Sequence, residues 1–240
     1  MNKGRLRTPF LYGDFKRMAV ANFDPFLLPI DAISGEARLD AERMQEDWLR
    51  QRFVNPLPWT PERSGERRIR ATGAPPRPAA VLMPIVIREE GAMLLFTRRT
   101  ANLRDHAGQI SFPGGSTEPG DASPIDTALR ETEEEIGLAR SRVEIIGNLP
   151  EYFTGTGYRI TPVVGLVKPP FEVAPDPGEV AEIFEVPLAF LMDGMHHQRR
   201  TVASPWEDQR RTLYTMPYQH FFIWGATAGM LRNLFHFLRS

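Results

Sequence analysis

Residues 114–138 read GGSTEPGDASPIDTALRETEEEIGL, and this stretch predicts a helix with clear start and stop signals. Ser123 can cap the helix, and Pro124 suits its first position. Asp126 favours the positive end of the helix dipole. Gly137 can adopt the left-handed conformation that commonly ends a helix. We therefore predict a helix over residues 124–136.

The predicted helix has two unlike faces. With successive residues about 100° apart, one narrow stripe should face the core, and it is formed by Ile125, Leu129, Thr132 and Ile136. On the opposite side Glu131 and Glu135 overlie each other, with Glu134 as a neighbour of Glu131. Like charges at these spacings destabilise a helix by roughly a few tenths of a kcal/mol per pair, so the three carboxylates favour a bound cation. The alternative is a solvated acidic face, which is the common state of a Glu-rich helix.

A glycine turn before the helix favours the cation. The segment 111–115 contains Gly114 and Gly115, which let the backbone approach a ligand closely, and Phe112, which can anchor the turn. Mg²⁺ prefers oxygen ligands and is commonly held by one or two carboxylates together with substrate phosphates. A carboxylate can also orient or deprotonate an attacking water. The combination predicts metal-dependent hydrolysis of a pyrophosphate linkage.

The remainder of the chain predicts an α/β layer arrangement around this helix. Short apolar segments typical of strands lie at residues 79–88, 93–97, 143–149, 161–167 and 183–186, and further helices are expected at 187–192 and 226–238. Residues 1–77 look different, with scattered prolines and a breaker at 73–78. We interpret them as an extension with one amphipathic helix over residues 40–53, followed by a main domain over residues 78–240.

The bulk composition narrows the class of partner. Lys and Arg number 29 against 30 Asp and Glu, so no global field would gather nucleic acid or an anionic membrane. The chain has no cysteine, which excludes disulfides and thiolate ligands and agrees with a reducing compartment. Its longest apolar segments fall short of the roughly 20 residues that cross a bilayer. We expect a cytoplasmic protein that acts on a small molecule, without a nucleic-acid or membrane partner.

Several other features do not predict a site by themselves. His196 and His197 are adjacent, so both cannot easily reach one metal ion. His106 could act as a base, although a lone loop histidine is usually solvated. Aromatic side chains near the last strand could stack on an adenine but are more often core, and they are Trp206, Tyr214, Tyr218, Phe221 and Phe222.

The run from Arg130 to Leu138, together with Gly115, resembles the box of the Nudix hydrolases. Asp121 stands six positions after Gly115, as in that box, but eight residues rather than seven separate Asp121 from Arg130. The longer spacing is similar to that of one Nudix subgroup, the coenzyme A pyrophosphatases. That subgroup's upstream signature is matched by residues 95–100, Arg104, Gly108 and 112–115, with mild departures at Phe96 and Thr100. Residues 79–82 and 223–228 also resemble its first strand and last helix, so the resemblance covers about residues 78–240.

This resemblance implies an α/β/α sandwich around a mixed β-sheet, with Mg²⁺ or Mn²⁺ as cofactor. It implies that Glu131 and Glu135 are the principal metal ligands, that Glu134 is an additional one, and that Arg130 braces the glutamates. The implied catalytic set is Glu135, Glu134 and Arg130, and the expected contacts to the substrate come from Arg99, Arg104, Gly114 and Gly115. A glutamate outside the box, for example Glu179 or Glu182, could serve as the base instead of Glu135.

The resemblance also implies a substrate. Coenzyme A or an acyl derivative would be cut into 4'-phosphopantetheine, or its acyl form, and adenosine 3',5'-bisphosphate. Two alternatives stay open: hydrolysis of another nucleoside diphosphate derivative such as ADP-ribose or a dinucleoside polyphosphate, and a catalytically silent ligand-sensing module. A homodimer is compatible with all three.

Overall fold

The structure is a computed structural model that describes residues 25–62, 75–101, 107–203 and 210–240. Its centre is an eight-stranded sheet in which β2 and β8 pair in parallel and the other neighbours pair antiparallel. The strands of this sheet are β2 (Arg77–Arg88), β3 (Gly91–Arg99), β4 (Ile110–Ser111), β5 (Gly114–Ser116), β6 (Val143–Asn148), β7 (Tyr152–Phe153), β8 (Tyr158–Val167) and β9 (Val180–Pro187). The sheet is therefore mixed, as predicted.

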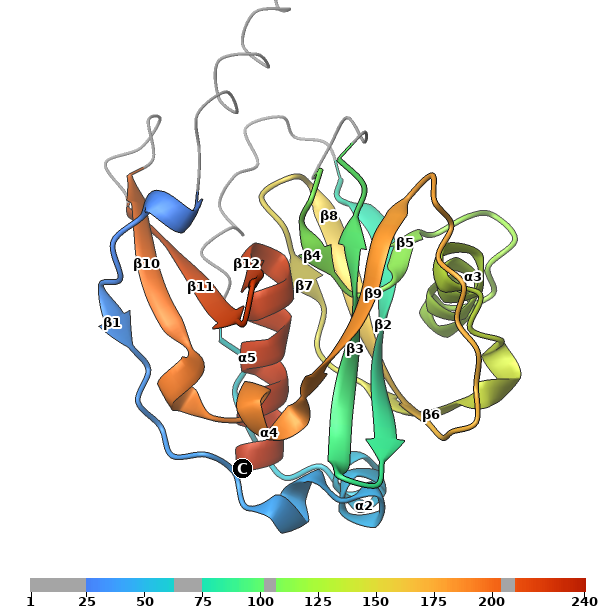
Figure 1. The fold of residues 1–240 in the computed structure, drawn as a ribbon, viewed down its shortest axis with the longest axis horizontal. Helices are drawn as coiled ribbons and strands as arrows, with labels where there is room; N and C mark the ends of the chain where they lie inside the picture. The colour runs from blue at the N-terminus through green and yellow to red at the C-terminus, as the bar shows by residue number, and fades with distance from the viewer. Residues whose placement is uncertain (1–24, 63–74, 102–106, 204–209) are drawn as a thin grey trace, which may run out of the picture.

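Two long helices cover opposite faces of this sheet, which confirms the α/β/α arrangement (Figure 1). Helix α3 (Pro124–Ile136) lies on one face, and α5 (Gly225–Arg239) lies on the other. The main hydrophobic cluster joins α5 to the sheet through buried residues such as Leu231, Phe235, Phe96 and Val164. Smaller clusters hold α3 against β2 and β8.

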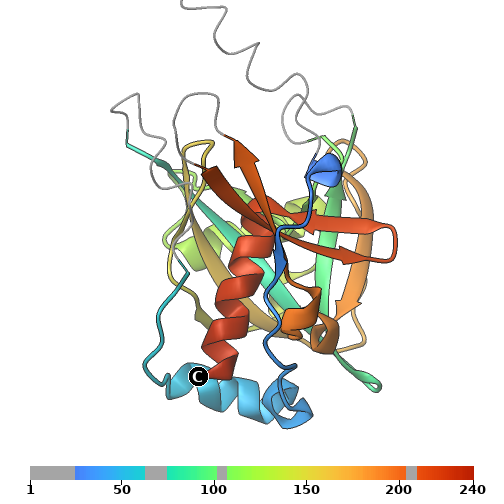
Figure 2. The ribbon, with the colours of Figure 1, turned by 90° about the vertical axis from the view of Figure 1, so that its left-hand side faces the viewer.

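A second sheet lies outside α5, and the sequence pattern did not predict it (Figure 2). Its order is β1 (Ala32–Ile33), β10 (Gln198–Ala203), β11 (Arg210–Tyr218) and β12 (Phe221–Trp224). Strand β10 lacks apolar alternation, so periodicity gave no signal for it. Phe221 and Phe222 are buried, which supports the core interpretation of those aromatics, whereas Trp206 lies outside the described residues.

The N-terminal extension packs on the same core. The predicted helix over residues 40–53 is present as a 3₁₀ turn, η2 (Ala41–Met44), and a helix, α2 (Glu46–Val54), with extended backbone at Gln45 between them. Met44 and Leu49 are buried in the cluster that contains α5. The described part of the extension also includes η1 (Pro25–Leu27). None of the described helices is long and apolar enough to cross a membrane.

Helix α3 has the predicted bounds. The Ser123 hydroxyl accepts a hydrogen bond from the Asp126 N–H at 3.2 Å, and Gly137 ends the helix at φ 67°. The predicted core stripe is wrong at its first position, because Ile125 is 37% exposed. Ala128 and Glu135 are buried instead, since α3 packs on Ala80, Leu82 and Val163 through the side that carries Ala128. The inward face is therefore rotated toward the glutamates.

The short elements after α3 complete the fold. They are η4 (Arg140–Arg142), α4 (Leu188–Leu191) and η5 (Gly194–His196). Helix α4 occupies the middle of the helix predicted at 187–192. His197, which follows η5, is buried, and its ring contacts the Leu191 carbonyl at 2.7 Å and Arg232 at 2.9 Å. This side chain is a core histidine held by protein groups.

Candidate active site

Glu135 is the most buried carboxylate of α3 and faces the glycine turn. Its side chain is 5% exposed, and its Oε2 accepts a hydrogen bond from the Gly114 N–H at 3.1 Å. Arg99, at the end of β3, places Nη1 3.6 Å from Glu135 Oε1. Burial raises the pKa of Glu135 to about 7, with the charges of Glu179 and Glu131 adding to the rise and Gly114 and Arg99 opposing it. A carboxyl with this pKa can exchange a proton near neutral pH.

The two glycines of the turn are required by close packing. Gly114 has φ 151° and pairs with Val81 of β2, so a Cβ there would collide with the backbone of Ala80 and Val81. A Cβ on Gly115 would lie 2.5 Å from the Glu131 carboxyl group. The glycines therefore let strand β5 touch α3 at the positions that carry carboxylates.

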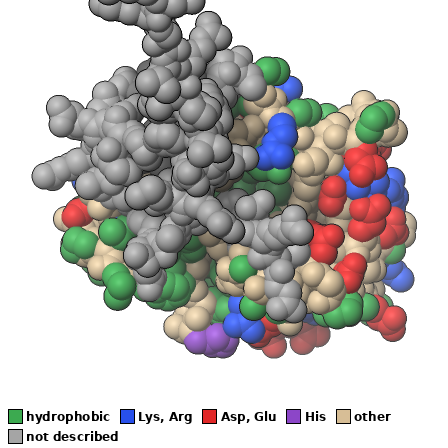
Figure 3. Space-filling view, turned by 90° about the horizontal axis from the view of Figure 1, so that it is seen from above, with side chains coloured by type: hydrophobic (Ala, Val, Ile, Leu, Met, Phe, Trp, Pro, Cys, Tyr) green, Lys and Arg blue, Asp and Glu red, His purple; other side chains and the backbone are tan. Residues whose placement is uncertain are grey.

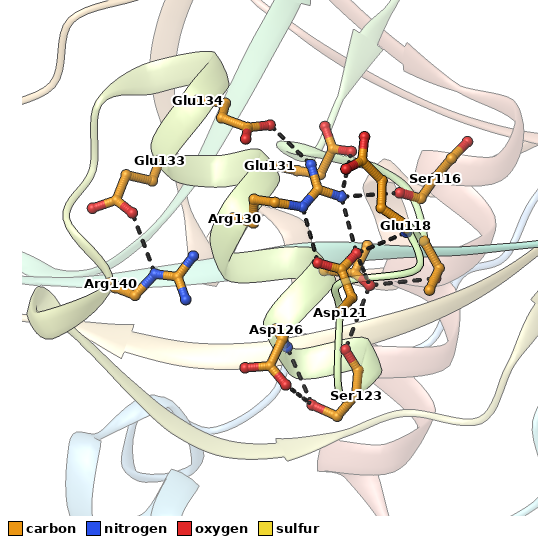
Figure 4. A network of polar contacts seen from close by, with 12 residues as sticks. Ser116, Glu118, Asp121, Ser123, Asp126, Arg130, Glu131, Glu133, Glu134 and Arg140 are labelled. Carbon is orange, nitrogen blue, oxygen red and sulfur yellow. Dashed lines mark hydrogen bonds and ion pairs between the residues drawn. The ribbon is translucent and has the colours of Figure 1, made fainter.

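Arg130 lies among the acidic side chains of the loop and helix (Figure 4). Its Nε and Nη2 each lie 3.0 Å from an oxygen of Asp121, so the pair is bidentate. It also contacts Glu131 at 3.1 Å and Glu134 at 2.9 Å. Hydrogen bonds from Arg130 and from the Glu118 N–H lower the pKa of Asp121 well below its usual range. Asp121 thus fixes the guanidinium, which in turn holds two glutamates.

The three candidate glutamates differ in exposure. The side chain of Glu134 is 59% exposed and that of Glu131 18%, against 5% for Glu135. Burial raises the pKa of Glu131, while its contacts with Arg130 oppose the rise. Figure 3 shows Asp and Glu side chains gathered on the side of the molecule where α3 lies. The three candidate carboxyl groups therefore range from buried, at Glu135, to exposed, at Glu134.

The segment after α3 brings a fourth glutamate, Glu179, to the group. The Asp176 N–H donates to the Glu135 carbonyl at 2.9 Å, and the Thr100 N–H donates to the Glu179 carbonyl at 2.9 Å. Glu179 lies close enough to raise the pKa of both Glu135 and Glu131. A turn signal, Asp-Pro-Gly at residues 176–178, marked this segment in the sequence, but nothing local indicated that it returns to α3.

The other candidate residues either have partners elsewhere or lie outside the described part of the chain. Glu182 forms an ion pair with Arg98 at 2.8 Å. Arg104 and His106 lie outside the described residues. Among the described residues, no three Asp, Glu or His side chains stand close enough together to hold one metal ion in this arrangement. Glu131 and Glu134 are instead turned to Arg130, and Glu135 to Gly114.

Comparison with known proteins assigns the fold to a family. A family model described as "NUDIX domain" matches residues 76–206. The "Uncharacterized Nudix hydrolase NudL" of Photorhabdus laumondii is 40% identical over 183 residues, which cover 76% of this chain and 92% of the relative. The protein of the same name from Escherichia coli K12 is 44% identical over 163 residues, covering 66% of this chain and 81% of the relative.

Solved structures resemble the chain less closely. A MutT protein from Methanosarcina mazei Go1 is 24% identical and covers 51% of this chain and 84% of that protein, with a TM-score of 0.41. A Nudix hydrolase from Alicyclobacillus acidocaldarius is 20% identical and covers 50% and 83%, with a TM-score of 0.42.

Proposed function

This chain belongs to the NUDIX family of hydrolases, and on that premise we propose that it cleaves the pyrophosphate linkage of coenzyme A or an acyl-CoA. Water adds across one P–O–P bond and yields 4'-phosphopantetheine, or its acyl form, and adenosine 3',5'-bisphosphate. The observation that carries the hydrolytic chemistry is the buried Glu135 carboxyl, whose pKa is raised to about 7 beside Gly114, Glu131 and Glu179. The spacing of the box and the signature at residues 95–115 support the choice of coenzyme A.

The donor set fits a hard divalent cation. Glu131 and Glu135 lie one turn apart on α3, burial raises the pKa of both carboxyls, and carboxylate oxygens are the ligands that Mg²⁺ and Mn²⁺ prefer. We propose these two as the principal ligands, with Glu134 as a further one. When bound, such an ion neutralises charge on the diphosphate and acidifies bound water.

The remaining roles fall to the protein's own groups. Glu135 or Glu179 takes the proton of the attacking water, and the raised pKa of Glu135 suits that task. Arg99 and Arg104 contact the substrate phosphates, because a guanidinium matches phosphate geometry. Arg130 keeps Glu131 and Glu134 in place. The resemblance assigns Gly114 and Gly115 to the substrate site, and their lack of a side chain lets the turn lie directly against Glu135 and Glu131.

A matched pair of variants on α3 tests the site. Glu135→Gln should lower kcat by roughly 10² to 10⁴ because it removes a carboxylate at the reacting centre. Glu133→Gln is the control, since Glu133 lies on the exposed side of the same helix and pairs only with Arg140 at 3.2 Å among the contacts seen. Release of 4'-phosphopantetheine with added Mg²⁺ or Mn²⁺ is measured by chromatography. Undiminished turnover in Glu135→Gln would contradict the assignment.

A second pair of variants tests whether Glu179 is the base that takes the proton from the attacking water. Glu179→Gln should lower kcat by about 10² or more and shift the acidic limb of the pH–rate profile if Glu179 takes the proton. Glu182→Gln should change kcat by no more than a few-fold, because it removes a partly exposed ion pair with Arg98. Equal losses in the two variants would remove Glu179 from the mechanism.

The choice of substrate has its own test. Coenzyme A, ADP-ribose and a dinucleoside polyphosphate are offered at equal concentration, and the products are separated. We expect the highest kcat/KM for coenzyme A. A higher value for another compound would keep the hydrolase and reassign the substrate, whereas tight binding without cleavage would indicate a ligand sensor.

A further inference from the structure

The turn of residues 176–179, which carries Glu179, is closed by its own hydrogen bonds. The Asp176 carboxylate accepts a hydrogen bond from the Gly178 N–H at 2.8 Å. The Asp176 carbonyl accepts from the N–H groups of Glu179 at 3.0 Å and Val180 at 2.8 Å. Bonds of this kind fix the local shape of a turn. They do not fix where the turn lies in the molecule, so contacts with other elements decide the position of Glu179.

Contacts with α3 and with the residue that follows β3 place this turn. On the α3 side, the Asp176 N–H donates to the Glu135 carbonyl at 2.9 Å. On the β3 side, the Thr100 N–H donates to the Glu179 carbonyl at 2.9 Å. The Thr100 hydroxyl adds a contact with the Gly178 carbonyl at 3.2 Å. Thr100 therefore holds two successive carbonyl groups of the turn.

An irregularity in the pairing of β3 with β9 brings Thr100 to the turn. The register shifts by one residue after Arg98, so that Arg99 pairs with Val180. Without the shift Thr100 would lie opposite Val180, and with it Thr100 lies opposite Glu179. Such β-bulges are common next to active sites, where they redirect a side chain. The bulge thus brings a hydroxyl-bearing residue beside the turn that carries Glu179.

The Thr100 side chain is suited to hold the turn firmly. Thr100 is only 8% exposed, and buried hydroxyl groups are satisfied by partners within the protein. Because threonine is branched at Cβ, its hydroxyl has few rotamers, so the contact with the Gly178 carbonyl has a set direction. Removal of the hydroxyl would leave that carbonyl without this donor.

The neighbours of Thr100 connect this contact to the candidate active site. Arg99, the preceding residue, lies 3.6 Å from Glu135. Glu179 lies close enough for its charge to act on both Glu135 and Glu131. A shift of the turn at Thr100 would therefore change the position of Glu179 relative to Glu135. A misplacement of about 1 Å at a reacting centre can cost on the order of 10² in rate.

We propose that Thr100 is a positioning residue whose hydroxyl holds the turn of residues 176–179, so that the Glu179 carboxylate reaches the attacking water beside Glu135. The inference rests on the proposed hydrolysis and on a role for Glu179 in it. Thr100 itself touches no reacting atom in this scheme. Its effect on the reaction passes through Glu179, and this dependence can be measured.

Thr100→Val tests this dependence, because it removes the hydroxyl and keeps the branched shape of the side chain. In wild-type protein this change should lower kcat for coenzyme A about three- to tenfold, the usual effect of losing one hydrogen bond, and should leave KM within roughly twofold. Thr100→Ser keeps the hydroxyl and should retain most of the wild-type kcat. In Glu179→Gln protein, adding Thr100→Val should lower kcat by less than about twofold, because the group that it positions is already lost.

Thr227→Val is the matched control. The Thr227 hydroxyl donates to the Ile110 carbonyl at 3.0 Å, between α5 and β4, so this variant loses the same kind of hydrogen bond. Its effect on kcat should be equal in wild-type and Glu179→Gln protein. Equal fold losses for Thr100→Val in the two backgrounds would show a merely structural role and overturn the proposal. A kcat of Thr100→Ser as low as that of Thr100→Val would also overturn it.

The single variants separate this proposal from the proposed function. If Glu179→Gln lowers kcat and Thr100→Val does not, the hydrolase assignment stands and the role of Thr100 falls. If Glu179→Gln leaves kcat unchanged, the roles of both residues fall while the hydrolase assignment stands. If the wild-type protein cleaves none of the offered compounds, amide hydrogen exchange decides. The Glu179 and Val180 N–H groups should then exchange roughly threefold or more faster in Thr100→Val and at the wild-type rate in Thr100→Ser, whereas unchanged exchange in Thr100→Val would overturn the proposal.

Discussion

Two networks of ion pairs, one around Arg130 on α3 and one around Arg232 on α5, use similar side chains but differ in the pKa values of their carboxylates. Each arginine contacts at least two carboxylates within about 3 Å. In the Arg232 network the pKa values of Glu36 and Glu62 are both lowered. Beside Arg130 the pKa of Asp121 is lowered but that of Glu131 is raised, and the pKa of Glu135, one turn further along α3, is raised as well. The comparison separates a region built for stability from one that retains uncompensated charge.

The Arg232 network fastens the N-terminal extension to α5. Arg232 is 3% exposed and contacts Glu36 at 2.9 Å and Glu62 at 2.7 Å, and His236 also reaches Glu62 at 2.8 Å. Burial alone would raise the pKa of Glu62, but hydrogen bonds from His236 and Arg232 outweigh it and lower the pKa to about 2. Charges are thus matched across two segments that lie far apart in the sequence.

The Arg130 network leaves negative charge in excess. Asp121 takes the bidentate contact with Arg130, so Glu131 and Glu134 share what remains of its donors. Within the described residues, the Glu135 carboxyl group contacts the more distant Arg99 at 3.6 Å and the Gly114 N–H. Raised pKa values follow from burial without sufficient compensation, which is the usual state of groups poised for chemistry.

The largest effect on stability should come from breaking the matched network. Arg232→Met leaves Glu36 and Glu62 without their main partner and should lower the free energy of unfolding by roughly 3 to 5 kcal/mol. Arg140→Met is the control, because its ion pair with Glu133 is exposed and should contribute less than about 1 kcal/mol. Urea unfolding measures both. Similar losses in the two variants would mean that the extension is not fastened by charge.

Substitution of Glu135 in the absence of metal should have a smaller effect on the free energy of unfolding, and this effect should be stabilising at high pH. Its pKa is about 7 in the folded protein and 4.5 as the ordinary value, so between these pH values the folded state holds a proton that the unfolded state has lost. Folded-state stability therefore falls as pH rises through this window, by roughly 3 kcal/mol in all. Glu135→Gln should abolish this loss and be more stable than wild type at pH 8 in EDTA.

The free energy of unfolding, measured with guanidinium chloride at pH 5 and pH 8, checks this expectation, and Glu133→Gln again serves as the control. Added Mg²⁺ should stabilise the wild-type protein at pH 8 more than it stabilises Glu135→Gln. A wild-type stability that does not fall between the two pH values would show that the Glu135 charge is compensated.

The smallest effect on stability is expected at the N-terminal cap of α3, the helix that carries Arg130. Ser123→Ala removes the cap at the start of α3 and should cost about 1 kcal/mol in the free energy of unfolding. The pH dependence of stability should stay the same, because the cap lies outside the contacts of Glu135. A change in that pH dependence, measured by the same unfolding experiment, would mean that the cap also holds the carboxylates in position.

The sequence by itself determined helix α3 and the presence of Arg130, Glu131, Glu134 and Glu135 on it. Caps and stop signals act on backbone groups a few residues away, so residues 123–137 carry all the information that delimits the helix. The same holds for the hairpin of β2 and β3, which lies where the apolar segments 79–88 and 93–97 were predicted as strands.

Only the tertiary structure decided how that helix is used. The strands against which α3 packs decide which of its residues are buried: Ile125, predicted in the core, is exposed, and Glu135 is buried. The same packing brings Gly114, Arg99 and Glu179 close to Glu135. The sheet of β10 to β12 and the fastening of the extension by Arg232 likewise join segments remote in the chain. Burial and Coulombic interaction depend on distance in space, and the order of residues along the chain does not specify that distance.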